Sequence, residues 1–334
     1  VYDTWMQKRD WIDRALATAE RESRRALKVI AAQVPADAAS ILVFNPTLQP
    51  RCESIEVDLP QTSVPSVTVR SSDGTPLPAV VEEHTLRFRT SEVPSLGYAV
   101  FQLSSGSSGG LQRRPVVAPP SIENAFYRVT FARDGSISEI LDKQLQRQLV
   151  DTSAKYGCNQ FVYSQDANAT FSSPTDATFE IESSPLGQTV ISRMEDPVSG
   201  ASIQQRVTLP THEKRIDIDN RLDHVRDLAG KKRWYRFGYY AFPFDVAHGE
   251  FRVGLNGCVA RPFQDRTGHG TEAYMAARDW ADISSEDFGI TVVQHDSQLV
   301  ECGKIHSDKN AFGERPGNSH LFSYVLNDWL YAHA

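Results

Sequence analysis

The sequence lacks the compact motifs that assign an enzyme to a reaction class. It has no HExxH zinc motif, no Walker phosphate loop, no GxSxG nucleophile turn and no GxGxxG dinucleotide turn. It also has no apolar run approaching the ~18–20 residues of a membrane-spanning helix. Basic residues are outnumbered, with 35 Lys and Arg against 42 Asp and Glu. That balance disfavours a nucleic-acid partner, because phosphate backbones bind basic surfaces.

Cysteine is scarce, and its spacing is unlike that of a metal site. The four cysteines lie far apart and form no CxxC pair, so we expect buried thiols rather than zinc ligands: Cys52, Cys158, Cys258 and Cys302. His306 and His333 are isolated histidines, and isolated histidines rarely bind metal. We therefore predict no metal site within this chain, and the thiols leave the compartment open.

The chain opens with a long amphipathic pattern over residues 1–36. Apolar residues recur at steps of three, four or seven, which places them on one stripe of a helix, and Pro35 ends it: Trp5, Ile12, Leu16, Ala19, Leu27 and Ile30. We interpret this segment as a packing helix. A stripe of this length needs a partner, either the β-domain that follows or a segment preceding Val1.

Short strands with turn signals follow over residues 38–104 and predict a small β-sandwich. The run Ser-Ser-Gly-Ser-Ser-Gly-Gly at residues 104–110 is followed by several prolines between residues 115 and 120, so we expect a flexible linker over residues 105–120.

Residues 121–334 read as a large antiparallel β-sandwich. The segment 126–131 alternates apolar and polar residues, Asp134-Gly135 is a hairpin turn signal, and a return strand carries Ile137 and Ile140. Many further short strands follow with few helical signals, which argues against a parallel βαβ sheet. The predicted fold class is mainly β: an N-terminal helix, a small sandwich and a large antiparallel sandwich.

Three polar clusters are candidates for contact with a sugar, because sugar sites combine aromatic rings with amides and carboxylates. The alternatives are an ordinary capped strand end for the first cluster and an internal Asp–Arg pair for the second. Trp280 to Ser284 reads as an edge strand whose side chains pack. The candidate residues are Asn159, Tyr163 and Asp166; Arg261, Asp265 and Arg266; and Asn327 and Asp328.

Several pieces of the sequence, in order and spacing, resemble the C-terminal β-domains of glycoside hydrolase family 38, the retaining α-mannosidases, in a bacterial-type member. The opening piece reads Glu-Asn-x-Phe-Tyr-x-Val-x-Phe, acidic-Gly, Ser-Ile, Asp-Lys and Leu-Val-Asp over residues 123–151. The others are Val43 to Pro46, Leu96 to Tyr98, Asn159 to Tyr163, Tyr239 to Phe244, Arg261 to Asp265, Trp280 to Ser284, Leu299 to His306, and Leu321 to Trp329. The last departs from the bacterial pattern at Asp328 and again at residues 331–333.

The resemblance implies a parent enzyme with a catalytic α/β barrel that carries an Asp nucleophile and zinc. That barrel has no counterpart here, so the nucleophile and the zinc fall on no residue of this chain. Residues 1–36 would end a helical bundle, and the large β-domain would be similar to the galactose mutarotase sandwich. The three candidate clusters would then be its contribution to an α-mannoside pocket.

Three hypotheses follow. The first is the C-terminal, catalytically incomplete portion of an α-mannosidase-like hydrolase, with the catalytic domain and a carbohydrate as its partners and neither membrane nor nucleic acid. The second is a stand-alone carbohydrate-binding or scaffold module. The third is a mutarotase-like isomerase, which requires a His and a carboxylate in one cleft; the sequence disfavours it, because no His lies in an acid–base setting. No targeting segment can be read, so the localisation is left unknown.

Overall fold

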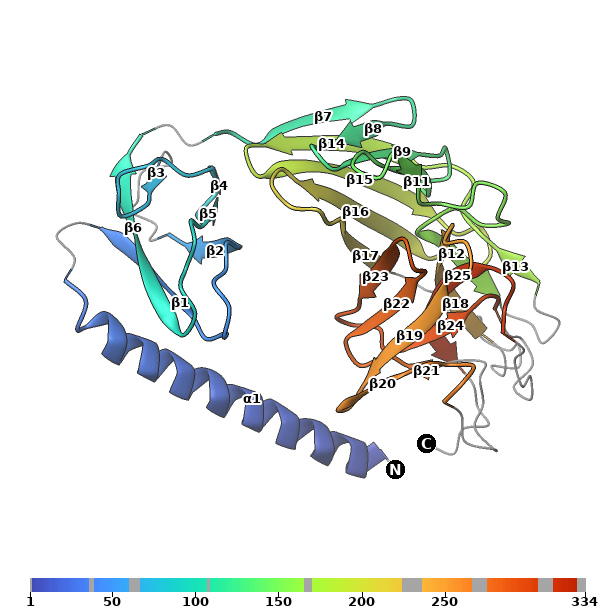
Figure 1. Cartoon of the computed structure of the whole chain (residues 1–334), viewed down its shortest axis with the longest axis horizontal. Coiled ribbons are helices and arrows are strands. Elements are labelled where there is room, and N and C mark those ends of the chain that lie inside the picture. Colours follow the sequence, from blue (N-terminus) through green and yellow to red (C-terminus); the bar gives the residue numbers. More distant parts are fainter. Residues whose placement is uncertain are drawn as a thin grey trace. The chain divides into compact units, whose positions relative to one another are not determined.

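The computed structural model describes residues 2–35, 39–59, 67–106, 109–164, 170–223, 236–265, 275–305 and 315–328, with side chains except at 2, 3, 5, 236, 327 and 328. The chain forms two compact units, Val1–Gln112 with Ser183–Leu186, and Arg113–Glu182 with Gly187–His333. The described part of the chain is mainly β, as the sequence predicts (Figure 1), and strand pairs of the small and large sheets are antiparallel, among them β1–β6 and β19–β22.

The first unit begins with helix α1 (Tyr2–Ala31), which ends four residues before Pro35 in a tightened last turn. Two residues of the predicted stripe, Ile12 and Leu16, are 67% and 59% exposed. Toward the other end, Leu27 and Ile30 face Phe44 across an apolar groove of about 760 Å³. No described helix is both long and apolar enough to cross a membrane.

Two three-stranded sheets complete this unit, in the orders β1-β6-β3 and β2-β5-β4. Phe88 and Phe101 meet edge to face in its core, with ring centroids 5.2 Å apart. The buried Asn45 amide donates to the carbonyls of Gln49, Val93 and Pro94, so it ties the end of β1 to the loop before β6. The strands are β1 (Ser40–Asn45), β2 (Ser54–Asp58), β3 (Val67–Arg70), β4 (Ala79–Glu82), β5 (Thr85–Arg89) and β6 (Gly97–Ser105).

The described residues of the second unit form four sheets. The five-stranded sheet is β17-β16-β15-β14-β7, and the hairpin sheet is β11-β10-β9-β8. Strand β7 falls inside the segment expected to be a linker. The strands are β7 (Gln112–Val116), β8 (Ser121–Glu123), β9 (Tyr127–Phe131), β10 (Ile137–Asp142), β11 (Arg147–Gln148), β14 (Thr178–Ser184), β15 (Gly187–Glu195), β16 (Ser202–Pro210) and β17 (Asp217–Asp223).

The other two sheets use the rest of the chain. The six-stranded sheet is β13-β12-β18-β25-β24-β21, and the four-stranded sheet is β20-β19-β22-β23. Their strands are β12 (Gln160–Ser164), β13 (Phe171–Ser172), β18 (Arg236–Phe244), β19 (Glu250–Leu255), β20 (Cys258–Ala260), β21 (Met275–Ala276), β22 (Trp280–Ser284), β23 (Gly289–Val293), β24 (Leu299–Cys302) and β25 (Ser319–Asp328).

The predicted hairpin is confirmed, and it contains an irregularity that the sequence encodes. Ile137 and Ile140 are three residues apart, whereas strand neighbours on one face are two apart. The register shifts between Ile137 and Glu139, and this bulge turns both isoleucines into the core. Gly135 takes the positive φ of the turn, at +87°.

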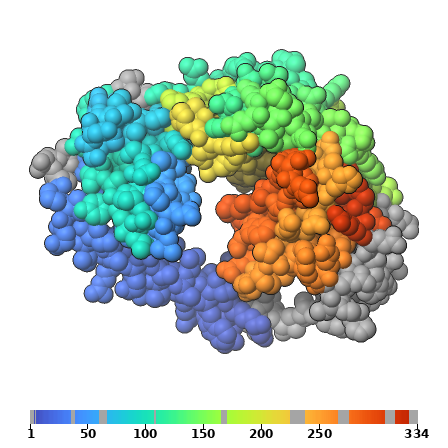
Figure 2. Space-filling model, in the orientation of Figure 1, coloured from blue at the N-terminus to red at the C-terminus, as the bar shows by residue number. Residues whose placement is uncertain are grey.

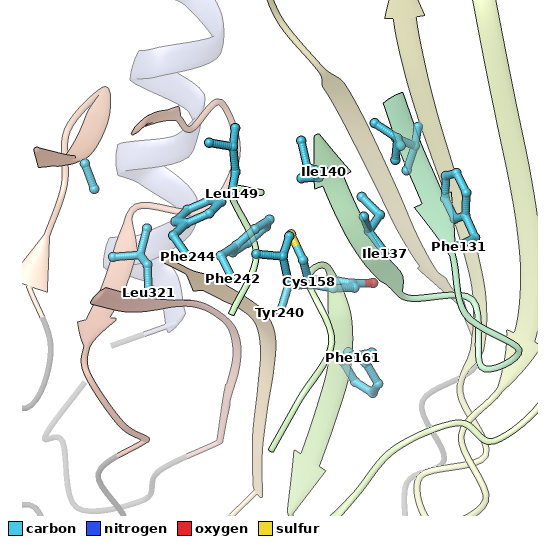
Figure 3. Packing of buried hydrophobic residues seen from close by; sticks show 14 of the residues in the cluster. Phe131, Ile137, Ile140, Leu149, Cys158, Phe161, Tyr240, Phe242, Phe244 and Leu321 are labelled. Atoms are coloured by element: carbon cyan, nitrogen blue, oxygen red, sulfur yellow. The ribbon is translucent and has the colours of Figure 1, made fainter. Parts of the chain in front are cut away.

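One large core joins the sheets of this unit. Phe131 and Ile137 of the hairpin and Phe161, Phe242 and Leu321 of the six-stranded sheet belong to it (Figure 3). A separate cluster lies on the opposite face of the six-stranded sheet, where successive side chains alternate between the two faces: Val162, Phe237, Tyr239, Ala241, Phe322 and Tyr324. The six-stranded sheet is therefore apolar on both faces.

Candidate functional site

The six-stranded sheet aligns the end of β12, which follows Tyr163 of the first cluster, with the residues of the third cluster on β25. Ser164 of β12 lies opposite Phe237 of β18, and Phe237 lies opposite Asn327 of β25. Asp328 lies opposite Arg236 in the next row. Asp166 follows Ser164 by two residues and lies outside the described residues. Ser164 on β12 and Asn327 on β25 therefore lie in one row with β18 between them, although 163 residues separate them in sequence.

Asn159 is fully buried and connects strands. Its φ of +57° places it in the left-handed region, and its side-chain amide exchanges two hydrogen bonds with that of Asn220, at 2.7 and 3.0 Å. The backbone carbonyl of Asn159 accepts a hydrogen bond from the side-chain amide of Gln205. The amide is committed to Asn220 in this structure, so the sugar contact predicted for Asn159 stays a prediction that requires this pairing to open.

Tyr163 points into the large core rather than away from the sheet. It is 1% exposed, and its ring stacks beside Phe161 with centroids 6.4 Å apart. Val162, the residue before it, takes the opposite face. The sugar contact predicted for Tyr163 likewise stays a prediction, and the structure places this ring on the core-facing side of the sheet.

The second cluster begins in the turn that follows β20 of the four-stranded sheet. Asp265 accepts hydrogen bonds from the backbone and guanidinium of Arg261, at 2.8–3.0 Å. These hydrogen bonds lower the pKa of Asp265 to about 2. The two residues thus form the internal pair that the sequence left as the alternative. Arg266 lies outside the described residues, as do His306 and His333.

Sequence reasoning missed a buried acid on the second face of the six-stranded sheet. The Tyr239 hydroxyl donates to Glu301 Oε1 at 2.8 Å, and the Tyr239 ring stacks on Tyr324 with centroids 4.5 Å apart. Glu301 is 1% exposed. Burial raises the pKa of Tyr239, and the nearby carboxylate of Glu301 raises it further, so the phenol stays a hydrogen-bond donor.

A signal for this arrangement was present in the sequence. Residues 239–244, 299–306 and 321–329 are three of the pieces that carried the family resemblance, and their strands β18, β25 and β24 are adjacent. Proximity was invisible in the sequence because 55 residues or more separate the first piece from the other two. The resemblance thus marked the strands without revealing that their side chains meet.

At the other end of β25, a histidine contacts a carboxylate. His320 Nε2 lies 2.9 Å from Asp151 Oδ2, and Asp151 also accepts hydrogen bonds from the amide and hydroxyl of Ser153. The bond from the Ser153 hydroxyl, followed by that from His320, lowers the pKa of Asp151 despite its partial burial. Both side chains keep some exposure, 14% for His320 and 28% for Asp151.

The described residues contain no group of three or more His, Cys, Asp or Glu side chains arranged to hold a metal ion. The expectation of four buried thiols is right for Cys158 and Cys302, and burial raises the pKa of each to about 12. It is wrong for Cys52 and Cys258, which are exposed because both lie in segments with little cover. Removal from water keeps the buried pair as neutral thiols.

Comparison with known families decides the identity. Residues 122–303, more than half of the chain, match the model of the glycosyl hydrolases family 38 C-terminal domain. The chain belongs to glycoside hydrolase family 38. The resemblance predicted from the sequence is therefore confirmed, and the matched range holds β8 through β24, including Tyr239 and Glu301. No curated protein matches the chain.

The family-38 assignment covers the second unit better than the first. The match begins at Ile122 in β8 and ends at Gly303 just after β24. Helix α1 and the small sandwich lie before it, and β25 lies after it. Membership therefore makes this chain part of a glycoside hydrolase with a carbohydrate substrate.

Proposed function

We propose that this chain is the C-terminal, catalytically incomplete portion of a retaining α-mannosidase-like hydrolase. The observation that carries the proposal is the match to the C-terminal domain of family 38. In this account the nucleophile and the zinc ion belong to a separate catalytic barrel of the parent enzyme. The β-domains pack on that barrel and lend side chains to its α-mannoside pocket.

The contribution of this chain is assigned to the sheet end where Ser164 and Asn327 are in line. Asp166, Asn327 and Asp328 are the side chains that would bind sugar hydroxyls there, and Arg266 would do so from the second loop. The strand order β12-β18-β25 supports this assignment, because it aligns the backbone of Ser164, Phe237 and Asn327 in one row although these residues come from distant segments of the chain.

Aromatic residues of the six-stranded sheet stabilise the arrangement of the strands that form this end. Tyr239 stacks on Tyr324 and donates to the carboxylate of Glu301. A stacked, hydrogen-bonded pair fixes the positions of β18 and β25 relative to β24, and precise placement of pocket groups is what a glycosidase requires. These residues therefore act as positioning residues rather than as substrate contacts.

The test compares hydrolysis of 4-nitrophenyl α-mannoside by a longer gene product that includes the catalytic barrel, with zinc, and by this chain alone. The proposal predicts release of 4-nitrophenol by the longer protein and none by this chain. Activity of this chain alone would contradict catalytic incompleteness. Inactivity of both proteins would contradict the hydrolase and favour a binding or scaffold role.

The contact between His320 and Asp151 favours a second candidate, the mutarotase-like isomerase. Mutarotation needs a base that takes the proton of the anomeric hydroxyl and an acid that protonates the ring oxygen, after which the ring opens and recloses. His320 would exchange the proton, and ionised Asp151 would orient the imidazole. Polarimetry of freshly dissolved α-mannose tests it: the chain should speed the rotation change and His320→Ala should not.

A further inference from the structure

The outer face of the four-stranded sheet carries an apolar row that crosses all four strands. Val259 of β20 pairs with Gly254 of β19, and Trp280 of β22 pairs with Val293 of β23. Val253 pairs with Ala281, so Gly254 and Trp280 are the next neighbours in this register. Val259 and Val293 are 54% and 62% exposed. The strands β19 to β23 are labelled in Figure 1, and their atoms reach the surface in Figure 2, coloured orange.

Trp280 belongs to the solvent side of this sheet. Ala281 and Ile283 are buried in the core on the inner side, and strand alternation places Trp280, Asp282 and Ser284 on the outer side, where all three are partly exposed. The expectation of an edge strand at Trp280–Ser284 is wrong, because β22 is paired with β19 on one side and with β23 on the other. The expectation that its side chains pack is right for Ala281 and Ile283 and incomplete for Trp280.

The indole lies flat on Gly254. A Cβ atom at Gly254 would lie 2.7, 2.8 and 3.1 Å from Nε1, Cε2 and Cδ1 of Trp280. A point in the plane of the ring cannot be this close to all three atoms, so the glycine lies beneath the face of the pyrrole ring. Glycine is required here because any side chain would lift the ring. The opposite face of the indole therefore turns away from the sheet.

Hydrogen-bonding groups flank this ring on both sides. In the next row, Arg252, Asp282 and Thr291 are aligned across three strands, and the Thr291 hydroxyl donates to Asp282 Oδ2 at 2.8 Å. Beyond the apolar row, the Arg278 guanidinium donates to the side chain of Asn256. An apolar plane is thus bordered by a carboxylate, two guanidiniums and an amide.

The geometry points to a carbohydrate-binding platform on this face, with Trp280 stacking on the C–H surface of a pyranose and Asp282 and Arg252 binding its hydroxyls. An aromatic plane beside paired donors and acceptors is complementary to a sugar, which has an apolar face and a polar rim. This site goes beyond the proposed function: it does not involve the sheet end of β12 and β25, and hydrolysis by the parent does not depend on it.

The size of the patch favours a glycan over a protein partner. Neighbouring strands lie about 4.8 Å apart, so the row from Val259 to Val293 spans roughly 14 Å. A stable protein interface buries about 800 Å² on each partner, far more than a single row one residue wide supplies. One or two sugar rings match that length, and a glycan chain could extend along the row.

Affinity electrophoresis in gels containing soluble α-mannan tests the platform with the full 334-residue chain. The chain should be retarded by mannan, Trp280→Ala should lose at least about tenfold in affinity, and Asp282→Asn should lose a smaller factor. Trp11→Ala is the matched control, because Trp11 is an exposed tryptophan on α1, with 58% exposure, and its loss should change nothing.

A second variant keeps the test decisive if Trp280→Ala fails to fold. Gly254→Ala retains the tryptophan and lifts it from the sheet, so it should weaken mannan binding while circular dichroism shows a folded protein. Equal retardation of Trp280→Ala and Trp11→Ala would overturn the proposal, as would absence of retardation of the unaltered chain. Concentration-dependent dimerisation that Trp280→Ala abolishes would also overturn it, and would make the face an interface between copies.

Discussion

Two sheets of the second unit present their outer faces in different ways. On the five-stranded sheet, β7, β14 and β16 carry alternating charges that neutralise each other: Glu182 accepts from Arg113 at 2.8 Å and from Arg206 at 2.7 Å. On the four-stranded sheet, the centre of the face is an indole held flat on a glycine, with charges only at its borders. Both sheets pack their inner faces on the same large core, so packing on the core does not explain why their outer faces differ.

The difference between the two outer faces indicates which of them is available to a ligand. On the first face, the carboxylate of Glu182 is neutralised by the guanidiniums of Arg113 and Arg206. The second keeps an aromatic plane and two exposed valines that water solvates poorly, a feature that contributes little to stability and suits a binding partner. Substitutions on the first face should therefore change stability, and substitutions on the second should change binding.

The largest effect on stability is expected at Glu182. Glu182→Ala removes a carboxylate that is 6% exposed and bound by two guanidiniums, and we expect a loss of about 1–3 kcal/mol in the free energy of unfolding. Asp282→Ala on the other face should cost less than about 1 kcal/mol, because its partner Arg252 is 41% exposed and solvent screens the pair. Urea denaturation of both variants measures the difference, and equal losses would contradict the comparison.

The same carboxylate should give the first face a characteristic pH dependence. Burial alone would raise the pKa of Glu182, but the hydrogen bonds from Arg113 and Arg206 offset it, and the pKa in the folded state is lowered from its ordinary value of 4.5. The unfolded chain then takes up the proton first as pH falls. The stabilisation is complete above pH 4.5 and declines below it.

Glu182→Gln provides the measurement. The difference in unfolding free energy between the unaltered chain and Glu182→Gln should be largest near pH 6 and should shrink toward pH 3, because protonation removes the charge that the substitution removes. A difference that is constant across this range would show that the carboxylate is not ionised in the folded protein.

A smaller stability effect is expected beneath the indole. Gly254→Ala places a methyl group 2.7–3.1 Å from the ring of Trp280, so the ring must move, at a cost of about 1–2 kcal/mol. Gly257→Ala in the following turn serves as a contrast, since its space is open and only its positive φ of 83° is strained. Thermal unfolding compares the two, and tryptophan fluorescence should shift in Gly254→Ala alone.

The smallest effect is expected at the edge of the apolar row. Val293 is 62% exposed, so Val293→Thr should change the free energy of unfolding by less than about 0.5 kcal/mol. Retardation by mannan should fall modestly in the same variant. A large loss of stability would show that the valine is packed and that this face is not open.

The sequence predicted the local structure well where the pattern was periodic. The hairpin around Asp134-Gly135 and the alternating strands are as expected, because turn chemistry and period-two alternation are local properties. The sequence was a poorer guide to features that depend on burial by distant segments of the chain. Cys52 and Cys258 are exposed, and β7 occupies a stretch that proline and glycine made look unstructured.

The candidate site was predictable only in part. That Ser164, Phe237 and Asn327 share a row could not be predicted from the sequence, because strand order in an antiparallel sheet is a tertiary property. The pairing of Arg261 with Asp265 was foreseen as an alternative because the two are four residues apart. Trp280 on Gly254 was not foreseen, since 26 residues separate them.

The most direct test of the central claim, that the polar end of the six-stranded sheet serves the substrate pocket of the parent enzyme, compares two asparagines on β25 or beside it. In the longer zinc-containing protein, Asn327→Ala should lower kcat/KM for 4-nitrophenyl α-mannoside by roughly tenfold or more, the loss of about one polar contact to substrate. Asn318→Ala, at the other end of the strand, should leave kcat/KM unchanged. Equal kcat/KM for both variants would contradict the assignment of this sheet end to the pocket.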